Sequence, residues 1–316
     1  MGNVKRLYSL SVCALLLGMI CTVNAQVAVS VSMNHGNLMA YEPVFAKVSL
    51  RNFSGHPLVF GKSEMMTGSI NFEIKGPRGE LIMPIDRNVM PTISGLLIES
   101  GKREEIIIQL SRYYPLFNTG RYSLRAYISH PQLKKSYQSD RISFSISSGI
   151  MIWEHMVGVP DIEGKRDKKE QIPQRNYKIS SLYDNNRNYY YLTVEDDTHI
   201  YSVRRIGVEM SMSRPQCEID RLSRLHVLLA TTPRIYSYFI FDHDGKLEHE
   251  AVYRKSDTTP LLVRNLVSGS VSLSGGELAK KGVDYGVEED NSFGQIPGST
   301  PSSEAQKQLQ GAGGTL

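Results

Sequence analysis

A period-two alternation of apolar and polar residues is the feature that most constrains the fold of this chain. It runs through residues 26–148 and is clearest in these segments: Val27–Val31, Val44–Leu50, Ile70–Ile74, Tyr122–Ile128 and Ile142–Ile146. Successive side chains of a β-strand point to opposite faces of the sheet, so each segment predicts a strand with one buried and one solvated face. Sheets of this kind hide their apolar faces by packing against each other, which predicts a β-sandwich.

Turn-forming residues separate the predicted strands, as a sandwich of short strands requires. They occur at Asn52–Gly55, Gly76–Gly79, Ser100–Gly101 and Asn118–Gly120. Further short strands are predicted at Pro57–Phe60 and Arg103–Leu110. About seven strands over roughly 120 residues is the size of an immunoglobulin-like (Ig-like) sandwich.

Two stretches within this region carry a resemblance to a known kind of domain. Residues 42–58 begin with Glu42-Pro43-Val44 and contain an Asn-x-Ser-Gly turn at Asn52–Gly55, and residues 120–126 have the pattern Gly-x-Tyr-x-Leu-x-Ala. They are similar to the opening and to a late strand of disulfide-free Ig-like domains in uncharacterised secreted bacterial proteins. The resemblance implies an Ig-like fold with Tyr122 in its core or at a corner. It implies no activity, because this fold hosts many functions.

Residues 1–25 have the three parts of a secretory signal peptide. Lys5 and Arg6 form a basic start, an apolar run extends to Val23, and Ala25 ends a segment suited to signal peptidase. A membrane-spanning helix needs about 20 apolar residues, more than this run supplies. A lipidated cysteine is the other alternative, but the bulky residue before Cys21 disfavours it. We expect cleavage after Ala25, a secreted or periplasmic location and no membrane-spanning segment in the mature chain.

Cleavage would change the charge and the cysteine content of the chain. Loss of Lys5 and Arg6 lowers the formal net charge from +4 to +2, and Cys217 remains as the only cysteine. The mature chain therefore cannot form an intrachain disulfide. So small a net charge gives no reason to expect a nucleic-acid partner.

Residues 149–285 are also predicted to form strands, which indicates a second antiparallel domain. The clearest predicted strands are Tyr177–Leu182, Tyr189–Val194, His199–Ile206, Arg234–Phe241 and Lys246–Arg254. Asp242–Gly245 predicts a hairpin between the last two, because Asp-Gly favours left-handed turn geometry. A turn is expected at Asp220–Arg224, followed by a strand. The domain is expected to be a second sandwich or one or two propeller-like blades, since no repeat period supports a full propeller.

The end of the first domain and the end of the chain give two further expectations. Gly149–Glu154 is an apolar run that contains the only Trp, and we expect Trp153 to be buried where the two domains meet. Residues 286–316 are rich in Gly, Ser, Pro and Gln, and such a segment cannot bury enough apolar surface to offset its ordering entropy. A disordered tail is therefore predicted. The chain divides into a signal peptide (1–25), an Ig-like sandwich (26–148), a second β-rich domain (149–285) and this tail.

The sequence contains no motif that is specific for catalysis. It has no Gly-x-Ser-x-Gly elbow, no P-loop and no Gly-x-Gly-x-x-Gly. Cys217 could act as a thiol nucleophile with His226 or His199 as its base, but a lone cysteine of this kind is more often structural. We predict no catalytic residues and no cofactor.

Metal binding has candidates that are better explained as turns. Asp242-x-Asp244-Gly245 is similar to the start of a calcium loop, but no Glu closes the loop at the required spacing. His243 and His249 could share a metal with Asp242 only if the hairpin placed them on one face. A third cluster contains Asp196, Asp197 and His199, and an exposed turn explains it. No metal site is predicted.

These observations favour a non-enzymatic binding or interaction module in the bacterial envelope, with a protein or a glycan as its partner. Tyr189, Tyr190 and Tyr191 are the predicted binding residues, because an alternating strand must point at least one of them outward. Two alternatives remain open. A protease inhibitor on an Ig-like scaffold would use the long loop Pro84–Gly95. A hydrolase with an accessory sandwich would need two carboxylates in a cleft.

Overall fold

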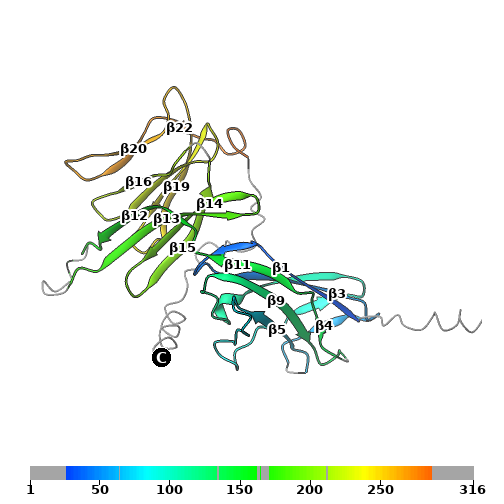
Figure 1. The fold of residues 1–316 in the computed structure, drawn as a ribbon. Coiled ribbons are helices and arrows are strands. Elements are labelled where there is room, and N and C mark those ends of the chain that lie inside the picture. Colours follow the sequence, from blue (N-terminus) through cyan, green and yellow to red (C-terminus); the bar gives the residue numbers. More distant parts are fainter. Residues whose placement is uncertain are drawn as a thin grey trace, which may run out of the picture.

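The computed structural model describes residues 26–63, 65–133, 135–161, 164, 171–210 and 213–286 (Figure 1). The predicted signal peptide and, beyond residue 286, the predicted tail lie outside these residues. The regular secondary structure of the described chain is almost entirely β-strand, mostly in antiparallel pairs, and the expected all-β fold is confirmed. Within the described residues no helix has the length and apolar character needed to cross a bilayer.

The first sandwich has the strand arrangement of an Ig-like domain. Its smaller sheet, in the order β1-β3-β8, consists of β1 (Val27–Met33), β3 (Phe45–Asn52) and β8 (Arg103–Gln109). Its larger sheet, in the order β2-β11-β9-β5-β6, consists of β2 (Asn37–Met39), β11 (Ile142–Ser147), β9 (Gly120–Ser129), β5 (Gly68–Lys75) and β6 (Thr92–Ile93). The remaining elements are β4 (Leu58–Phe60), β7 (Leu96–Ile98), β10 (Tyr137–Gln138) and a short 3-10 helix, Leu110–Arg112. The neighbours are not consecutive in sequence, as in the Greek-key order of Ig sandwiches.

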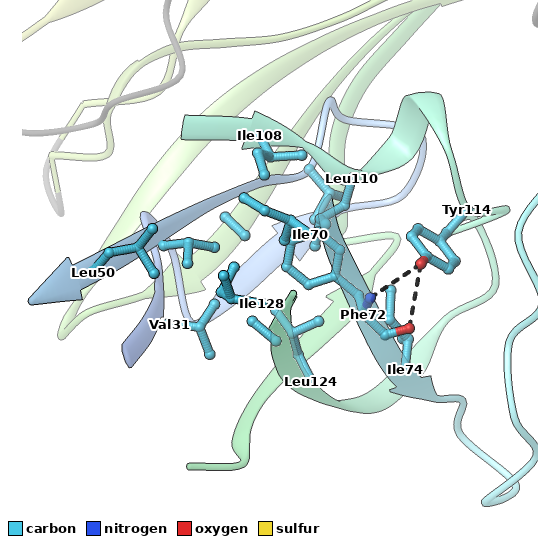
Figure 2. Close-up of a cluster of buried hydrophobic side chains, with 14 of the residues drawn as sticks. Val31, Leu50, Ile70, Phe72, Ile74, Ile108, Leu110, Tyr114, Leu124 and Ile128 are labelled. Atoms are coloured by element: carbon cyan, nitrogen blue, oxygen red, sulfur yellow. Dashed lines mark hydrogen bonds between the residues drawn. The ribbon is translucent and has the colours of Figure 1, made fainter. Parts of the chain in front are cut away.

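The alternating apolar residues of both sheets form one core between them. Figure 2 shows Ile70, Phe72 and Ile74 of β5 packed with side chains from several other strands of the sandwich. At one end of this core the Tyr114 hydroxyl accepts a hydrogen bond from the Phe72 N–H (3.3 Å) and lies 3.2 Å from the Phe72 carbonyl oxygen, to which it donates (Figure 2). The polar end of this buried ring is therefore satisfied.

Tyr122 has the role that the sequence predicts. Its ring is buried and stacks on Phe144 at a centroid distance of 5.2 Å, and its hydroxyl donates a 2.7 Å hydrogen bond to the Asn118 carbonyl. This bond to a backbone oxygen four residues upstream is the tyrosine corner of Ig-like sandwiches.

The second half of the chain forms another sandwich. One sheet, in the order β12-β13-β14-β15, consists of β12 (Ile150–Gly158), β13 (Gln174–Asp184), β14 (Arg187–Glu195) and β15 (Ile200–Val208). The other, in the order β16-β17-β18-β19-β22, consists of β16 (Gln216–Ile219), β17 (Leu225–Ala230), β18 (Ile235–Phe241), β19 (Leu247–Arg254) and β22 (Glu277–Leu278). A hairpin of β20 (Leu261–Arg264) and β21 (Val271–Ser274) packs on the outer face of this second sheet through the buried Leu262. The predicted hairpin at Asp242–Gly245 is confirmed, with Gly245 at φ +77°, as is the turn before β17.

The sheet that contains β14 is covered on both faces near its centre. On one face Ile179 and Leu192 pack against Phe241 and other residues of the opposite sheet. On the other face Leu182 packs with Met39, the last residue of β2 in the first sandwich. The two sandwiches are thus joined through an apolar contact between β2 and the strands β13 and β14.

The expectation for Trp153 is wrong. Its strand, β12, is at the edge of its sheet, and Trp153 is only half-buried, against the core of the second sandwich. Ile150, Met151 and Ile152 are exposed. The physical reason is that β2, rather than the apolar run after the first sandwich, fills the space between the two sandwiches.

Candidate functional site at the junction of the two sandwiches

A groove of about 350 Å³ lies where the two sandwiches meet. Asn37 belongs to the first sandwich, whereas Ile150, Ile152, Ser181 and Glu209 belong to the second. Ser181 donates a hydrogen bond from its hydroxyl to the Glu209 carboxylate. The groove therefore combines an acidic polar wall with an aliphatic wall.

Asn37 is held firmly at the first wall of this groove. Its side-chain amide donates to the Tyr183 carbonyl (2.9 Å), and its backbone N–H donates to the Asp184 carboxylate (2.9 Å). Its side-chain oxygen is buried and has no hydrogen-bond partner among the described residues. A buried amide oxygen without a donor is costly, so this atom is a weak point in the packing of the junction.

The strand β12 continues the aliphatic wall of the groove. It is nine residues long, and within the described chain it pairs only with β13, so its other edge is open. Ile150 is 72% exposed, and Met151 and Met156 are each 57% exposed. An open strand edge presents unpaired backbone N–H and C=O groups that another extended chain can pair with.

A buried polar cluster below the groove fixes one sandwich against the other. His35, in the turn before β2, places its Nδ1 3.0 Å from the carboxylate of Asp184 at the end of β13. Because a carboxylate only accepts, Nδ1 of His35 carries the proton. Arg205 of β15 completes the cluster, with its guanidinium 3.2 Å from Nε2 of His35 and 3.3 Å from the centre of the Tyr189 ring.

Two carboxyl groups near the junction, those of Asp184 and Glu42, have pKa values shifted in opposite directions. Burial would raise the pKa of Asp184, but hydrogen bonds from His35 and from the Asn37 backbone outweigh it, and the pKa lies below its ordinary value. Glu42 accepts only one backbone N–H, from Met39 (3.0 Å). Burial of its carboxyl is the largest influence there and raises the pKa of Glu42. The surroundings of Asp184 therefore favour its ionised form, whereas burial disfavours the ionised form of Glu42.

The three predicted binding residues do not form an exposed patch. Tyr189, Tyr190 and Tyr191 are all buried, so the expectation that one of them faces solvent is wrong. Tyr190 packs into the core of the second sandwich, and its two neighbours point to the opposite face, where Met39 covers them. The three side chains alternate between the two faces of the sheet as expected, but other residues cover both faces at this point.

The other sequence candidates lie apart from the groove. Asp242 and Asp196 accept backbone N–H groups of their own turns, as the sequence predicts. Burial raises the pKa of the Cys217 thiol to about 12, which makes it a poor nucleophile. Among the described residues, no group of three or more His, Cys, Asp or Glu side chains is placed to hold a metal ion.

A second buried polar set was also missed by sequence reasoning. His226 lies with Nδ1 2.7 Å from the Tyr238 hydroxyl and Nε2 3.4 Å from the Asp220 carboxylate, which also pairs with Arg224. All three members of this Asp-His-Tyr set are buried, and Tyr238 lies on the outer face of the second sheet, in the cluster that contains Leu262. Burial lowers the pKa of His226 in spite of the nearby carboxylate. The set stabilises the turn between β16 and β17.

The residues of the junction were not identified from the sequence. His35 and Asp184 are 149 positions apart, and no local pattern links them. The only available signal was the polar stretch His35-Gly36-Asn37, which interrupts the apolar alternation between two predicted strands.

Comparisons with known proteins give no family for this chain. No family model matches it, and no curated protein does. Among solved structures, it is similar to the CARDB domain of a Pyrococcus furiosus protein, with 9% identity and a TM-score of 0.26 over 39% of this chain and 95% of that one. It is also similar to a family 123 glycoside hydrolase from Clostridium perfringens, with 17% identity and a TM-score of 0.23 over 39% of this chain and 27% of that one. Neither likeness is close enough to assign an activity.

Proposed function

We propose that this protein is an exported, non-enzymatic binding module that holds an extended segment of a protein partner along β12 and in the adjoining groove. The observation that carries the proposal is the open nine-residue edge of β12 with its exposed aliphatic side chains. A segment that added to this edge would pair its backbone with β12 and bring its side chains beside Ile150 and Ile152, where a bulge interrupts the pairing of β12 with β13.

The groove supports a polypeptide as the ligand. The carboxylate of Glu209 lines the groove and only accepts hydrogen bonds, so it suits an N–H donor of an incoming chain. The buried cluster of His35 and Asp184 holds the two walls in place before binding. A preformed site reduces the ordering cost of association.

Other readings of the site have less support. A glycoside hydrolase needs two carboxylates about 5–10 Å apart, and of the described residues that line the groove only Glu209 carries one. An inhibitory loop at Pro84–Gly95 would have to protrude. That segment is tied to the sandwich, since Ile85 donates its N–H to the Tyr113 carbonyl and Thr92 pairs with Ser69. Export rests on the predicted signal peptide.

The proposal is tested with a phage-displayed library of linear peptides selected on the purified chain. Enriched peptides should alternate apolar side chains, and their binding should be lost in the double variant Ile150→Lys, Ile152→Lys. Ile107→Lys is the matched control, because Ile107 is an exposed isoleucine on another edge strand, β8. Peptides that bind the double variant as well as the wild type would overturn the proposal. So would a glycan array signal that the double variant abolishes while no peptide is enriched.

A further inference from the structure

The hairpin β20–β21 ends in an exposed aliphatic tip. Leu266 and Val267 are 93% and 98% exposed, more than any other large apolar residue among those described. Figure 1 shows this hairpin, drawn in orange, at the outer rim of the second sandwich, away from the first. Two adjacent aliphatic side chains exposed to this extent at the end of a projecting element need a physical explanation.

The apolar character continues from the tip along one face of the hairpin. Leu262 points inward and anchors the hairpin on the second sandwich, whereas Leu261 and Val263, on either side of it, are exposed. The hairpin is thus held from behind, and Leu261 and Val263 add exposed aliphatic surface on its outer face, beside Ser272 and Ser274 of β21.

The polar backbone of the tip is already satisfied within the turn. The Asn265 side-chain oxygen accepts hydrogen bonds from the N–H groups of Val267 (2.9 Å) and Ser268 (3.0 Å). The backbone of Asn265 donates to the Ser270 carbonyl and accepts from Gly269, each at 2.8 Å. A turn whose N–H groups are bonded internally can leave water at a lower cost than an open loop, because few donors are left without partners.

Two exposed arginines flank the tip. Arg264 precedes the tip, and Arg221 packs against the turn with its backbone N–H bonded to the Gly269 carbonyl (2.9 Å). Both arginine side chains are exposed, and no acidic residue occurs between positions 258 and 276. Aliphatic groups that project past a pair of arginines match a surface with an anionic layer over an apolar interior.

We propose that the β20–β21 tip inserts Leu266 and Val267 into the interface of an anionic phospholipid bilayer, with Arg264 and Arg221 at the level of the lipid phosphates. Apolar burial and electrostatic attraction act together in this kind of peripheral binding. The proposed peptide site on β12 uses other side chains, Ile150 and Ile152, so the two proposals fail independently.

The test measures sedimentation of the full chain with vesicles of about one part phosphatidylglycerol to three parts phosphatidylcholine. The wild type should sediment with these vesicles, and less as salt is raised, because salt screens the attraction. The double variant Leu266→Ser, Val267→Ser should bind at least about tenfold more weakly, since full burial of one such side chain changes a partition constant by roughly 10- to 100-fold. Leu97→Ser, at an exposed leucine of the first sandwich, should bind as the wild type does.

Two further measurements separate the electrostatic contribution to vesicle binding from the apolar one. Arg264→Gln with Arg221→Gln should weaken binding to the anionic vesicles, and vesicles of phosphatidylcholine alone should bind the wild type more weakly. A wild type that stays in the supernatant overturns the proposal, as does a tip variant that sediments like the wild type. Wild-type oligomers that disappear in the tip variant, without any vesicle binding, would assign the tip to a protein contact instead.

Discussion

Replacing Asp184 by Asn removes the negative charge of the buried His35–Asp184 pair while keeping the shape of the side chain. The carboxylate accepts from the backbone of Gly36 and Asn37 and from Nδ1 of His35. An Asn side chain keeps one oxygen for the backbone donors and places an amide against His35. A hydrogen bond to a charged group contributes about 1.5–3 kcal/mol, and the substitution weakens more than one such bond. We expect the free energy of unfolding to fall by about 2–4 kcal/mol.

The pH dependence of this difference follows from the pKa of Asp184. Because the folded-state pKa is lowered, the carboxylate stabilises the fold above its unfolded pKa of about 3.9, and that contribution is lost as the pH falls through the folded value. Urea unfolding followed by circular dichroism should show the full difference between wild type and D184N at neutral pH, and a shrinking one below about pH 4. The exposed Asp257→Asn is the matched control and should change little.

Glu42→Gln separates this reasoning from a general sensitivity of the junction. The pKa of Glu42 is raised by burial, so its favourable contribution exists at acid pH and is lost as the pH rises through the folded value. Glutamine removes the buried charge and keeps an oxygen for the Met39 N–H. We therefore expect E42Q to raise the unfolding free energy at neutral pH, opposite in sign to D184N. Equal destabilisation by both variants, or a D184N effect that does not change with pH, would refute the argument.

Three other expectations can be checked directly. Tyr122→Phe should cost about 0.5–1.5 kcal/mol in urea unfolding, because it removes only the hydrogen bond to the Asn118 carbonyl; no loss at all would show that the corner bond adds nothing. Cys217 should react slowly with iodoacetamide at pH 8 until the chain is unfolded, because its pKa is raised to about 12; fast labelling of the native chain would contradict this. Mass spectrometry of the mature protein should identify Gln26 as its first residue, and an intact Met1 would exclude the predicted cleavage.

The local structure of this protein could be predicted from its sequence. Alternation in segments such as Tyr122–Ile128 predicts strands with one buried face, because side-chain direction along a strand depends only on position. The turn at Asp242–Gly245 depends on short-range chemistry, since the carboxylate of Asp242 accepts the N–H groups of the next residues and Gly245 tolerates a positive φ. Such strands and turns depend on residues that are close together in the chain, so they can be predicted from the sequence alone.

Only the tertiary structure decided which faces are covered and which edge is open. Tyr189 and Tyr191 alternate with Tyr190 as expected, yet all are buried because β2 from the first sandwich covers the second face of their sheet. The run around Trp153 is apolar, yet packing leaves Trp153 half-buried on an edge strand, against the core of the second sandwich, instead of buried between the domains. Burial is a property of the surrounding elements and not of the strand itself, so a period-two pattern shows which residues share a face and cannot show what lies against that face.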